Sequence, residues 1–335
     1  MFEENLIEIC KNRKITLAFP ESFDVRVLKA AWRILKDTIV EKVYLFGEKE
    51  KILSTADSHS IELAPYLSQI VWVSSEMPSL TSEFKRFLQN WHKTRKLDET
   101  TQEKIYISPL YLSAYLLREK LVDSVVSGAV YTSSEVIKAG LKILDLSPGS
   151  STLSSSFLFH KSHRGFDEKF LFADCGVLVA PTAGQLLNIA KDTLRTWSLL
   201  PGHELKTPKI VFLSFSTKGS ASHPSAEKMR QAREMFLNNH PEVICDGEMQ
   251  FDAAFDPLIR SVKAPNSPIK GCADIFIFPN LDAGNIAYKI MQKCAGYKAW
   301  GPILQGFSRP YTDLSRGASV EDIIYSVCLN SLRVK

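Results

Sequence analysis

Short apolar, β-branched runs alternate along this chain with amphipathic stretches of helical period, and this alternation limits the possible folds more than any other feature. In the first half we expect strands at Ile15–Phe19, Lys42–Phe46, Gln69–Val73 and Asp123–Ser127. We expect helices at Asp24–Lys36, Ser79–Trp91, Pro109–Lys120 and Ser133–Leu144. This order is typical of an α/β fold with a mostly parallel sheet covered on both faces. In such sheets ligands bind beyond the carboxyl ends of the strands.

The same alternation continues in the second half. Strands are expected at Thr152–Phe159, Phe170–Ala173, Lys209–Phe215, Ala273–Phe278 and Trp300–Leu304. Helices are expected at Thr182–Leu199, Ser225–Asn238, Ala283–Cys294 and Ser319–Leu332. The charged stretch His160–Lys169 is the most loop-like of the chain. A chain of 335 residues predicts about two domains at roughly 150 residues each.

Composition excludes several classes of protein. The net charge of +4 is too small to indicate a nucleic-acid partner. Six scattered cysteines without C-x-x-C spacing argue against a zinc site and fit buried thiols of a reducing cytoplasm. The first 14 residues lack the apolar core of a signal peptide, and the apolar runs are too short to span a membrane. We therefore expect a cytoplasmic protein with no membrane and no nucleic-acid partner.

One segment dense in small polar residues follows a predicted strand and opens a helix. It is Ser127–Ser134, with the sequence SGAVYTSS. Small residues let backbone amides and hydroxyls approach a ligand, and a helix N-terminus favours an anion. The plainer interpretation is a tight turn whose serine caps the helix. The residues Ser127, Gly128 and Thr132 are therefore candidates for substrate binding.

Two further segments lie in the second half. The loop Ser214–Ser220 resembles a phosphate loop in composition but lacks the Walker A order, so a solvated loop is an equal alternative. The segment Cys245–Asp252 holds three acids, but it has neither a nearby histidine nor EF-hand spacing. Its plain interpretation is a strand followed by a polar turn that holds neighbouring loops by hydrogen bonds.

The segment Gln305–Gly317 follows a strand and leads to the last helix. Its two arginines, Arg309 and Arg316, suit a phosphate because arginine forms bidentate, charge-assisted bonds to phosphate oxygens. The residues that follow, Ser319 to Asp322, have the spacing of a capping box, with Ser319 as the N-cap. From the residues alone, capping is the simpler role for Asp322.

These segments together resemble the phosphate acetyltransferase (phosphotransacetylase) family. The resemblance runs from about Leu110 to Val327, and it is weaker toward the N-terminus. It is carried by six stretches in the family order: VVSGAVYTSSEVIKAGLKILDLSPGSSTLSSSFLF, ADCGVLVAPTAGQL, LSFSTKGSASHPSAEKM, DGEMQFDAAFDP, KAPNSPIKGCADIFIFPNLDAGNIAYKI and GPILQGFSRPYTDLSRGASVEDI. Six stretches in order are far more specific than any one of them.

The resemblance implies an isocitrate/isopropylmalate dehydrogenase-like fold of two α/β domains with the active site in the interdomain cleft. Domain 1 would be residues 1–148 plus 304–335, and domain 2 a continuous insertion of residues 149–303. Family members are homodimers. The implied reaction is acetyl-CoA + phosphate ⇌ acetyl phosphate + CoA, by direct thiolate attack in a ternary complex. Coenzyme A is a substrate, and no metal or redox cofactor takes part.

The family pattern also assigns roles to residues. Arg316 would bind the phosphoryl group and the carbonyl oxygen, Ser315 would donate a hydrogen bond to the transition state, and Asp322 would be the general base toward the thiol. A covalent acetyl-cysteine is not needed, and Ala318 stands here where the family often has cysteine.

Two family arginines linked to CoA or phosphate binding are changed in this chain. One is replaced by His92 or displaced to Arg95, and the other is Lys138. Lysine keeps the charge but loses the planar fork of arginine. Three alternatives remain: a phosphate butyryltransferase, an oxidoreductase on the related dehydrogenase fold, and a non-catalytic binding protein. The oxidoreductase would need a nucleotide site, and no G-x-G-x-x-G follows a strand.

Overall fold

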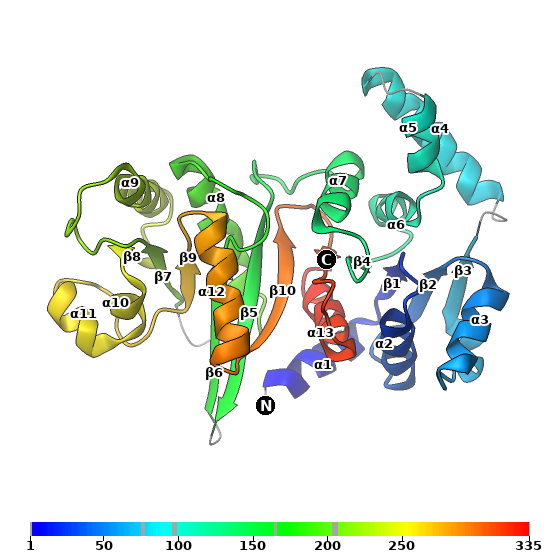
Figure 1. The fold of residues 1–335 in the computed structure, drawn as a ribbon, viewed down its shortest axis with the longest axis horizontal. Helices are drawn as coiled ribbons and strands as arrows, with labels where there is room; N and C mark the ends of the chain where they lie inside the picture. Colours follow the sequence, from blue (N-terminus) through cyan, green and yellow to red (C-terminus); the bar gives the residue numbers. More distant parts are fainter. Residues whose placement is uncertain (1, 75–77, 96–98, 164–165, 203–206, 335) are drawn as a thin grey trace. The chain divides into compact units, whose positions relative to one another are not determined.

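The computed structural model describes residues 2–334 except 75–77, 96–98, 164–165 and 203–206. The chain divides into two compact units, which we describe separately (Figure 1). One unit comprises residues 4–145 and 307–335, and the other comprises residues 1–3 and 146–306. None of the helices in the described part combines the length and the apolar character that a membrane crossing requires.

The first unit, residues 4–145 and 307–335, is built on a five-stranded sheet in the order β11-β4-β1-β2-β3. All four strand pairs are parallel. The strands are β1 (Thr16–Phe19), β2 (Lys42–Phe46), β3 (Ile70–Val73), β4 (Ser124–Ser127) and β11 (Tyr311–Asp313). Because the strands are parallel, their carboxyl ends lie at one edge, and the loops after β1, β4 and β11 meet there.

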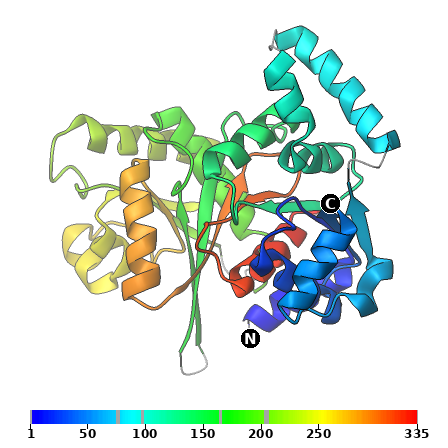
Figure 2. The same cartoon turned by 45° about the vertical axis from the view of Figure 1, so that its right-hand side comes forward.

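Helices join and cover these strands. Their bounds are α1 (Phe2–Arg13), α2 (Val25–Lys36), α3 (Lys49–Ser58), the 3₁₀ turn η1 (Ala64–Gln69), α4 (Pro78–Arg95), α5 (Glu99–Tyr106), α6 (Pro109–Arg118), α7 (Ser133–Ile143) and α13 (Val320–Ser331). The helices α2 and α13 pack on each other, and α6 and α7 form a second pair (Figure 2). The helix α2 illustrates why such helices pack: its residues Val27, Leu28, Ala31 and Leu35 are buried and form one apolar face at helical spacing.

The second unit, residues 1–3 and 146–306, is built on a six-stranded sheet in the order β10-β5-β6-β9-β7-β8. Its strands are β5 (Ser154–His163), β6 (Phe166–Ala173), β7 (Lys209–Leu213), β8 (Ile244–Met249), β9 (Ile275–Ile277) and β10 (Lys298–Gln305). Three neighbouring pairs are parallel, whereas β10 with β5 and β5 with β6 are antiparallel. Over both units the sheets are therefore mostly parallel, as expected from the sequence.

The helices of this unit are α8 (Ala183–Trp197), α9 (Pro224–Asn239), α10 (Phe251–Phe255), α11 (Pro257–Lys263) and α12 (Leu281–Cys294). An aromatic core lies under them. In that core Phe159, Phe170, Phe172 and Phe276 are buried in mutual ring contact. Such rings bury large apolar areas, and this explains the phenylalanine-rich strands of the second half.

The expectation that His160–Lys169 is a loop is wrong. Most of this stretch lies in the antiparallel β5–β6 hairpin, where Lys161 lies opposite Glu168. The His160 ring is buried, its Nδ1 lying 3.1 Å from Glu3 Oε1 and its Nε2 3.0 Å from Asp167 Oδ1. The charged side chains that indicated a loop also have partners within the protein, since Lys161 donates to the Ala295 carbonyl and Glu168 accepts the Tyr297 hydroxyl.

The segment Gln305–Gly317 also contains an element that the sequence did not reveal. Its residues Tyr311–Asp313 form β11, which pairs in parallel with β4. All three residues of β11 are buried. Three residues are too few for a detectable hydrophobic period.

Candidate active site

Three loops meet at the carboxyl edge of the five-stranded sheet, all within the first unit. Residues 20–24 follow β1, residues 128–132 follow β4, and residues 314–319 follow β11. The three strands are neighbours in the sheet, with β4 in the middle. The segment Ser315–Asp322, which the sequence analysis placed at the centre of the chemistry, therefore lies beside the loop that begins at Gly128.

The buried carboxylate of Glu21 holds the loop after β4. Its two oxygens accept hydrogen bonds from four consecutive backbone amides, those of Gly128, Ala129, Val130 and Tyr131, at 2.6–2.9 Å. Glu21 is 1% exposed. One interpretation of the sequence placed an anionic ligand at these amides, and the anion they meet in the structure is a side chain of the protein itself.

The remaining polar groups of that loop also bond within the protein. Thr132, not a serine, is the N-cap of α7, and it forms a reciprocal capping box with Glu135. The hydroxyl of Ser127 is buried and donates to the Thr312 carbonyl at 3.4 Å. Gly128 has φ +102°, and a Cβ there would overlap Asp313 Oδ1 and the main chain of Leu314. The plainer interpretation, a tight turn with a hydroxyl cap, describes this loop.

Arg26, at the start of α2, ties two loops together. Its Nη1 donates to the carbonyl oxygens of Arg316, at 2.7 Å, and Ala318, at 3.1 Å. Its Nη2 donates to the Ala129 carbonyl at 2.7 Å and pairs with Asp24 at 2.9 Å. The fixed fork of a guanidinium suits such a task because several donors keep one geometry. The loops carrying Gly128 and Arg316 are thereby held in register.

The side chains of Ser315 and Arg316 are exposed at this edge. Ser315 Oγ accepts the amide of Gly317 at 3.3 Å, which leaves its own O–H proton available as a donor. Among the residues described, none forms a hydrogen bond or ion pair with the guanidinium of Arg316. Its charge nevertheless reaches Glu135: hydrogen bonds from Thr132 do most to lower the pKa of that carboxyl, and the charges of Lys138 and Arg316 add to the effect. The site thus offers a hydroxyl donor and an uncompensated cation side by side.

The capping role inferred for Asp322 is confirmed. Ser319 is the N-cap of α13, and Asp322 Oδ2 accepts both its amide and its hydroxyl at 2.9 Å. The other oxygen, Oδ1, accepts no hydrogen bond from the described part of the chain. A carboxylate held by one oxygen is fixed in orientation and keeps the second for a proton.

A second acid lies behind the loop. Asp313, the last residue of β11, is 1% exposed, and its Oδ1 has no hydrogen-bond partner among the described residues. Burial raises the pKa of Asp313 to about 7, with a hydrogen bond from Ser133 opposing the rise and the charge of Glu21 adding to it. This carboxyl therefore changes protonation near neutral pH.

Other candidate residues lie elsewhere. Arg309 precedes β11 at its amino end, whereas Arg316 follows its carboxyl end, so the structure does not bring the two arginines together. Lys138 is exposed on α7. His92 and Arg95 belong to α4, but their side chains lie outside the described residues.

The two remaining segments of the sequence analysis belong to the second unit and hold each other. Glu248, 1% exposed, accepts the Ser216 hydroxyl at 2.9 Å and the Gly219 amide at 2.8 Å. Lys218 pairs with the buried Asp246. The interpretation of Cys245–Asp252 is confirmed in part: strand residues hold the neighbouring loop by hydrogen bonds, but the strand β8 is followed by the helix α10 and not by a turn. Ser214–Ser220 is not a free phosphate loop, because its polar groups are used within the protein.

In the described residues, no three His, Cys, Asp or Glu side chains come together in a way that could hold a metal ion.

Sequence patterns did not reveal the roles of Glu21 and Arg26. The available signal was weak: a Pro-Glu-Ser sequence directly after a buried strand. Their partners are about a hundred and about three hundred residues away, and no local pattern reveals such pairs.

Known proteins are similar to this chain over its whole length. A phosphate acetyltransferase of Thermoanaerobacterium thermosaccharolyticum is 35% identical over 337 residues, covering 99% of each chain. A phosphate acetyltransferase of Bacillus subtilis is 32% identical, covering 95% of this chain and 94% of its own. The crystal structure of a phosphotransacetylase from Streptococcus pyogenes superposes with a TM-score of 0.86 at 32% identity, covering 99% of this chain and 98% of that one. A profile described as phosphate acetyl/butaryl transferase matches residues 1–330, and the chain therefore belongs to this family.

Proposed function

We propose that this chain is a phosphate acetyltransferase that transfers an acetyl group reversibly between coenzyme A and inorganic phosphate. The observation that carries the proposal is the arrangement of Ser315, Arg316 and Asp322. They lie on one loop and the first turn of the helix that follows it, at the carboxyl edge of a parallel sheet. The names of the relatives point to the same reaction.

Arg316 binds the phosphoryl group of acetyl phosphate. Its guanidinium is exposed and unpaired in the described structure, while its main chain is fixed by Arg26. Because its backbone is held, the guanidinium can take fewer positions, which lowers the reorganisation needed as negative charge develops. The planar fork matches two phosphate oxygens.

Asp322 takes the proton of the CoA thiol. An unperturbed thiol has a pKa near ~8.5, so at neutral pH most of it is protonated and a base is needed. The proton moves to Asp322 Oδ1, the oxygen left over by the cap. The sulfur forms a bond to the acetyl carbon, and the bond between that carbon and the phosphate oxygen breaks, with its electron pair leaving on phosphate.

Ser315 stabilises the tetrahedral intermediate. Its hydroxyl accepts the Gly317 amide, which orients it, and donates its proton to the oxyanion. Direct attack in a ternary complex needs no covalent acetyl-enzyme. In the reverse direction phosphate attacks acetyl-CoA and the same groups act in the opposite sense.

Several finer points belong to the proposal and rest on the family resemblance. They are the dehydrogenase-like architecture with the active site in an interdomain cleft, domain limits of 1–148 plus 304–335 and 149–303, a homodimer, and chemistry without metal or redox cofactor. Ser127, Gly128, Thr132, Lys138, Arg309, His92 and Arg95 stay candidates for substrate contacts. A cytoplasmic location is supported by the six free cysteines, which a reducing compartment preserves.

Initial rates with the purified protein test the proposal. Thiol release from acetyl-CoA should require phosphate or arsenate, and acetyl-CoA should be preferred to butyryl-CoA when the two are compared side by side. Release that does not depend on the anion would refute a phosphate acyltransferase, and a preference for butyryl-CoA would refute the acetyl assignment.

A further inference from the structure

Two buried carboxyl groups approach the same glycine, Gly128, at the start of the loop after β4. Glu21 Oε2 accepts the amide of Gly128 at 2.8 Å. Asp313 Oδ1 lies so close to the same residue that a Cβ added to Gly128 would overlap it. Both acids are 1% exposed. The reaction steps derived above use neither of them, although Asp313 stands only two residues before Ser315.

The hydrogen bonds of the two acids decide which of them keeps a proton. Two carboxyl groups near each other in a buried site do not both ionise easily. Glu21 accepts four backbone amides, an arrangement that suits a carboxylate. Asp313 receives one hydroxyl, that of Ser133, and its Oδ1 has no hydrogen-bond partner among the described residues. Burial therefore raises the pKa of Asp313, and the charge of Glu21 adds to the rise.

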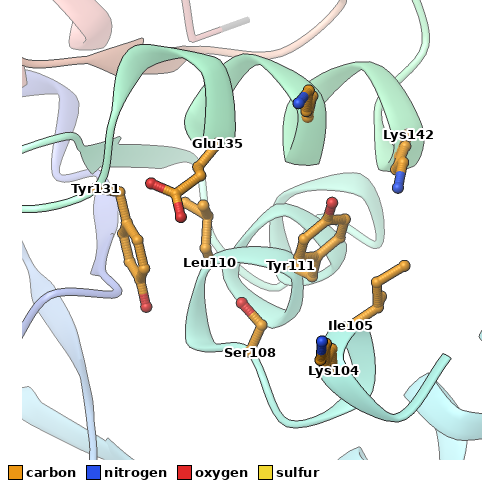
Figure 3. Close-up of a pocket in the computed structure, with 9 residues that line it drawn as sticks. Lys104, Ile105, Ser108, Leu110, Tyr111, Tyr131, Glu135 and Lys142 are labelled. Atoms are coloured by element: carbon orange, nitrogen blue, oxygen red, sulfur yellow. The ribbon is translucent and has the colours of Figure 1, made fainter. Parts of the chain in front are cut away.

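The other ionisable groups around Asp313 do not compensate a charge on it. Within the described part of the chain they form no hydrogen bond or ion pair with its carboxyl group. They are Arg26 of α2, Tyr131 in the loop after β4, Glu135 of α7, Tyr311 of β11, Arg316 in the loop after β11 and Asp322 of α13. Figure 3 shows the carboxyl group of Glu135 turned toward Tyr131. The surroundings of Asp313 thus favour its neutral form.

Ionisation of Asp313 would disturb the loop that carries the reacting groups. A charged Oδ1 requires hydrogen-bond donors, and the amides of Gly128 and Leu314 lie beside it. Both amides are already in use, since Gly128 donates to the other acid and Leu314 donates to the Ser127 carbonyl at 2.7 Å. Leu314 directly precedes Ser315. A charged Asp313 would compete for these amides and move the backbone from which Ser315 projects.

We propose that Asp313 is a positioning residue of the transfer reaction, and that its neutral carboxyl group holds the loop of Ser315 and Arg316 in the reactive arrangement. The inference rests on the proposed function, because it concerns the placement of the same reacting groups. Phosphate bound at Arg316, three residues away, adds negative charge and further disfavours a charge on Asp313. Since kcat/KM reports the free enzyme, it is the more sensitive constant to the loss of this proton.

Asp313→Asn tests the inference, because asparagine keeps the shape of the neutral carboxyl group and cannot ionise. At pH 6 its kcat/KM should lie within about threefold of the wild type, since the reacting groups are intact. The ratio of kcat/KM, variant over wild type, should rise about tenfold between pH 6 and pH 8, because only the wild type loses a proton over that range. The ratio cancels the titration of the thiol and of phosphate, which both enzymes share. A merely structural role would leave the ratio independent of pH.

Ser133→Ala should move the same titration. The Ser133 hydroxyl opposes the rise in the pKa of Asp313, so its removal should shift the pH at which kcat/KM falls upward, by up to about one unit. Ser134→Ala, which removes the neighbouring exposed hydroxyl of α7, is the matched control and should leave that pH unchanged.

Three results would each overturn the inference. They are a pH-independent ratio for folded Asp313→Asn, a folded Asp313→Asn that is inactive at pH 6, and a fall of kcat/KM in Ser133→Ala at the wild-type pH or below it. If Asp313→Asn does not fold, the profiles of Ser133→Ala and Ser134→Ala decide alone. Failure of the proposed function itself is distinct, because the wild-type protein would then show no phosphate-dependent thiol release at any pH.

Discussion

The guanidinium of Arg26 donates a 2.7 Å hydrogen bond to the main-chain carbonyl of Arg316, the residue whose own guanidinium is free at the edge of the sheet. One arginine thus fixes the backbone from which the other acts. The same side chain also bonds to Ala129, in the loop that Glu21 holds through four amides. The site therefore depends on residues near the start of the chain as well as on the segment that carries the reacting groups.

Arg26→Lys should lower kcat/KM about tenfold or more, because an ammonium lacks the rigid fork that reaches both loops and small misplacements of reacting groups are costly. We expect the loss mainly in kcat, with a melting temperature close to that of the wild type. Arg33→Lys is the matched control, since Arg33 lies on the same helix and its side chain forms an exposed ion pair with Glu321. Equal activity of both variants would show that the hydrogen bonds of Arg26 do not position the site.

Asp322→Asn and Ser319→Ala separate the two roles of the capping box. Asp322→Asn keeps an oxygen for the cap but removes the base, so kcat should fall about 100-fold or more while stability changes little. Ser319→Ala removes the cap and should lower the free energy of unfolding by about 1 kcal/mol while retaining most of the activity. Steady-state rates and thermal denaturation of both variants provide the test. Full activity in Asp322→Asn would remove Asp322 from the mechanism.

Gly128→Ala should be severely destabilising. The residue has φ +102°, and an added Cβ would overlap Asp313 and the main chain of Leu314. We expect a loss of about 2 kcal/mol or more in the free energy of unfolding, together with loss of activity. Gly184→Ala on α8 is the control, because nothing lies near its added Cβ, and it should be neutral or stabilising by up to about 1 kcal/mol. Chemical denaturation of both variants measures the difference.

Asp313→Asn should change how stability depends on pH. Burial raises the pKa of Asp313 to about 7 in the folded protein, well above the ordinary range of an aspartate carboxyl, so between these two pKa values the folded state holds a proton that the unfolded state has lost. Stability from this group is therefore present below about pH 4 and is lost as the pH rises through 7. The asparagine variant lacks this loss and should gain stability relative to the wild type between pH 5 and 8, by on the order of 1 kcal/mol or more. Parallel pH profiles would contradict the assignment.

The sequence patterns predicted much of the fold but not all of it. The strands β1, β2 and β4 and the helices α2 and α7 lie within about two residues of their predicted limits, because each carries a clear apolar period. The strand β11 is too short for a period, and the β5–β6 hairpin carries polar and charged residues whose partners lie more than a hundred residues away in the chain. Local patterns do not encode such partners.

The candidate site divides in the same way. Ser315, Arg316 and Asp322 lie within eight residues, so their combination is visible in the sequence, and so is the capping box of Ser319. Glu21 and Arg26 act through partners that only the folded sheet brings near. For the same reason the amides after Ser127, which looked open to a ligand, are already bonded to Glu21.

Phosphate-dependent thiol release from acetyl-CoA tests the account most directly when the wild type is measured beside folded Ser315→Ala, Arg316→Gln and Asp322→Asn variants. We predict release by the wild type only when phosphate or arsenate is present, a decrease of about 100-fold or more in kcat/KM for Arg316→Gln and Asp322→Asn, and a smaller decrease for Ser315→Ala. Wild-type release without dependence on phosphate, or variants as active as the wild type, would contradict it.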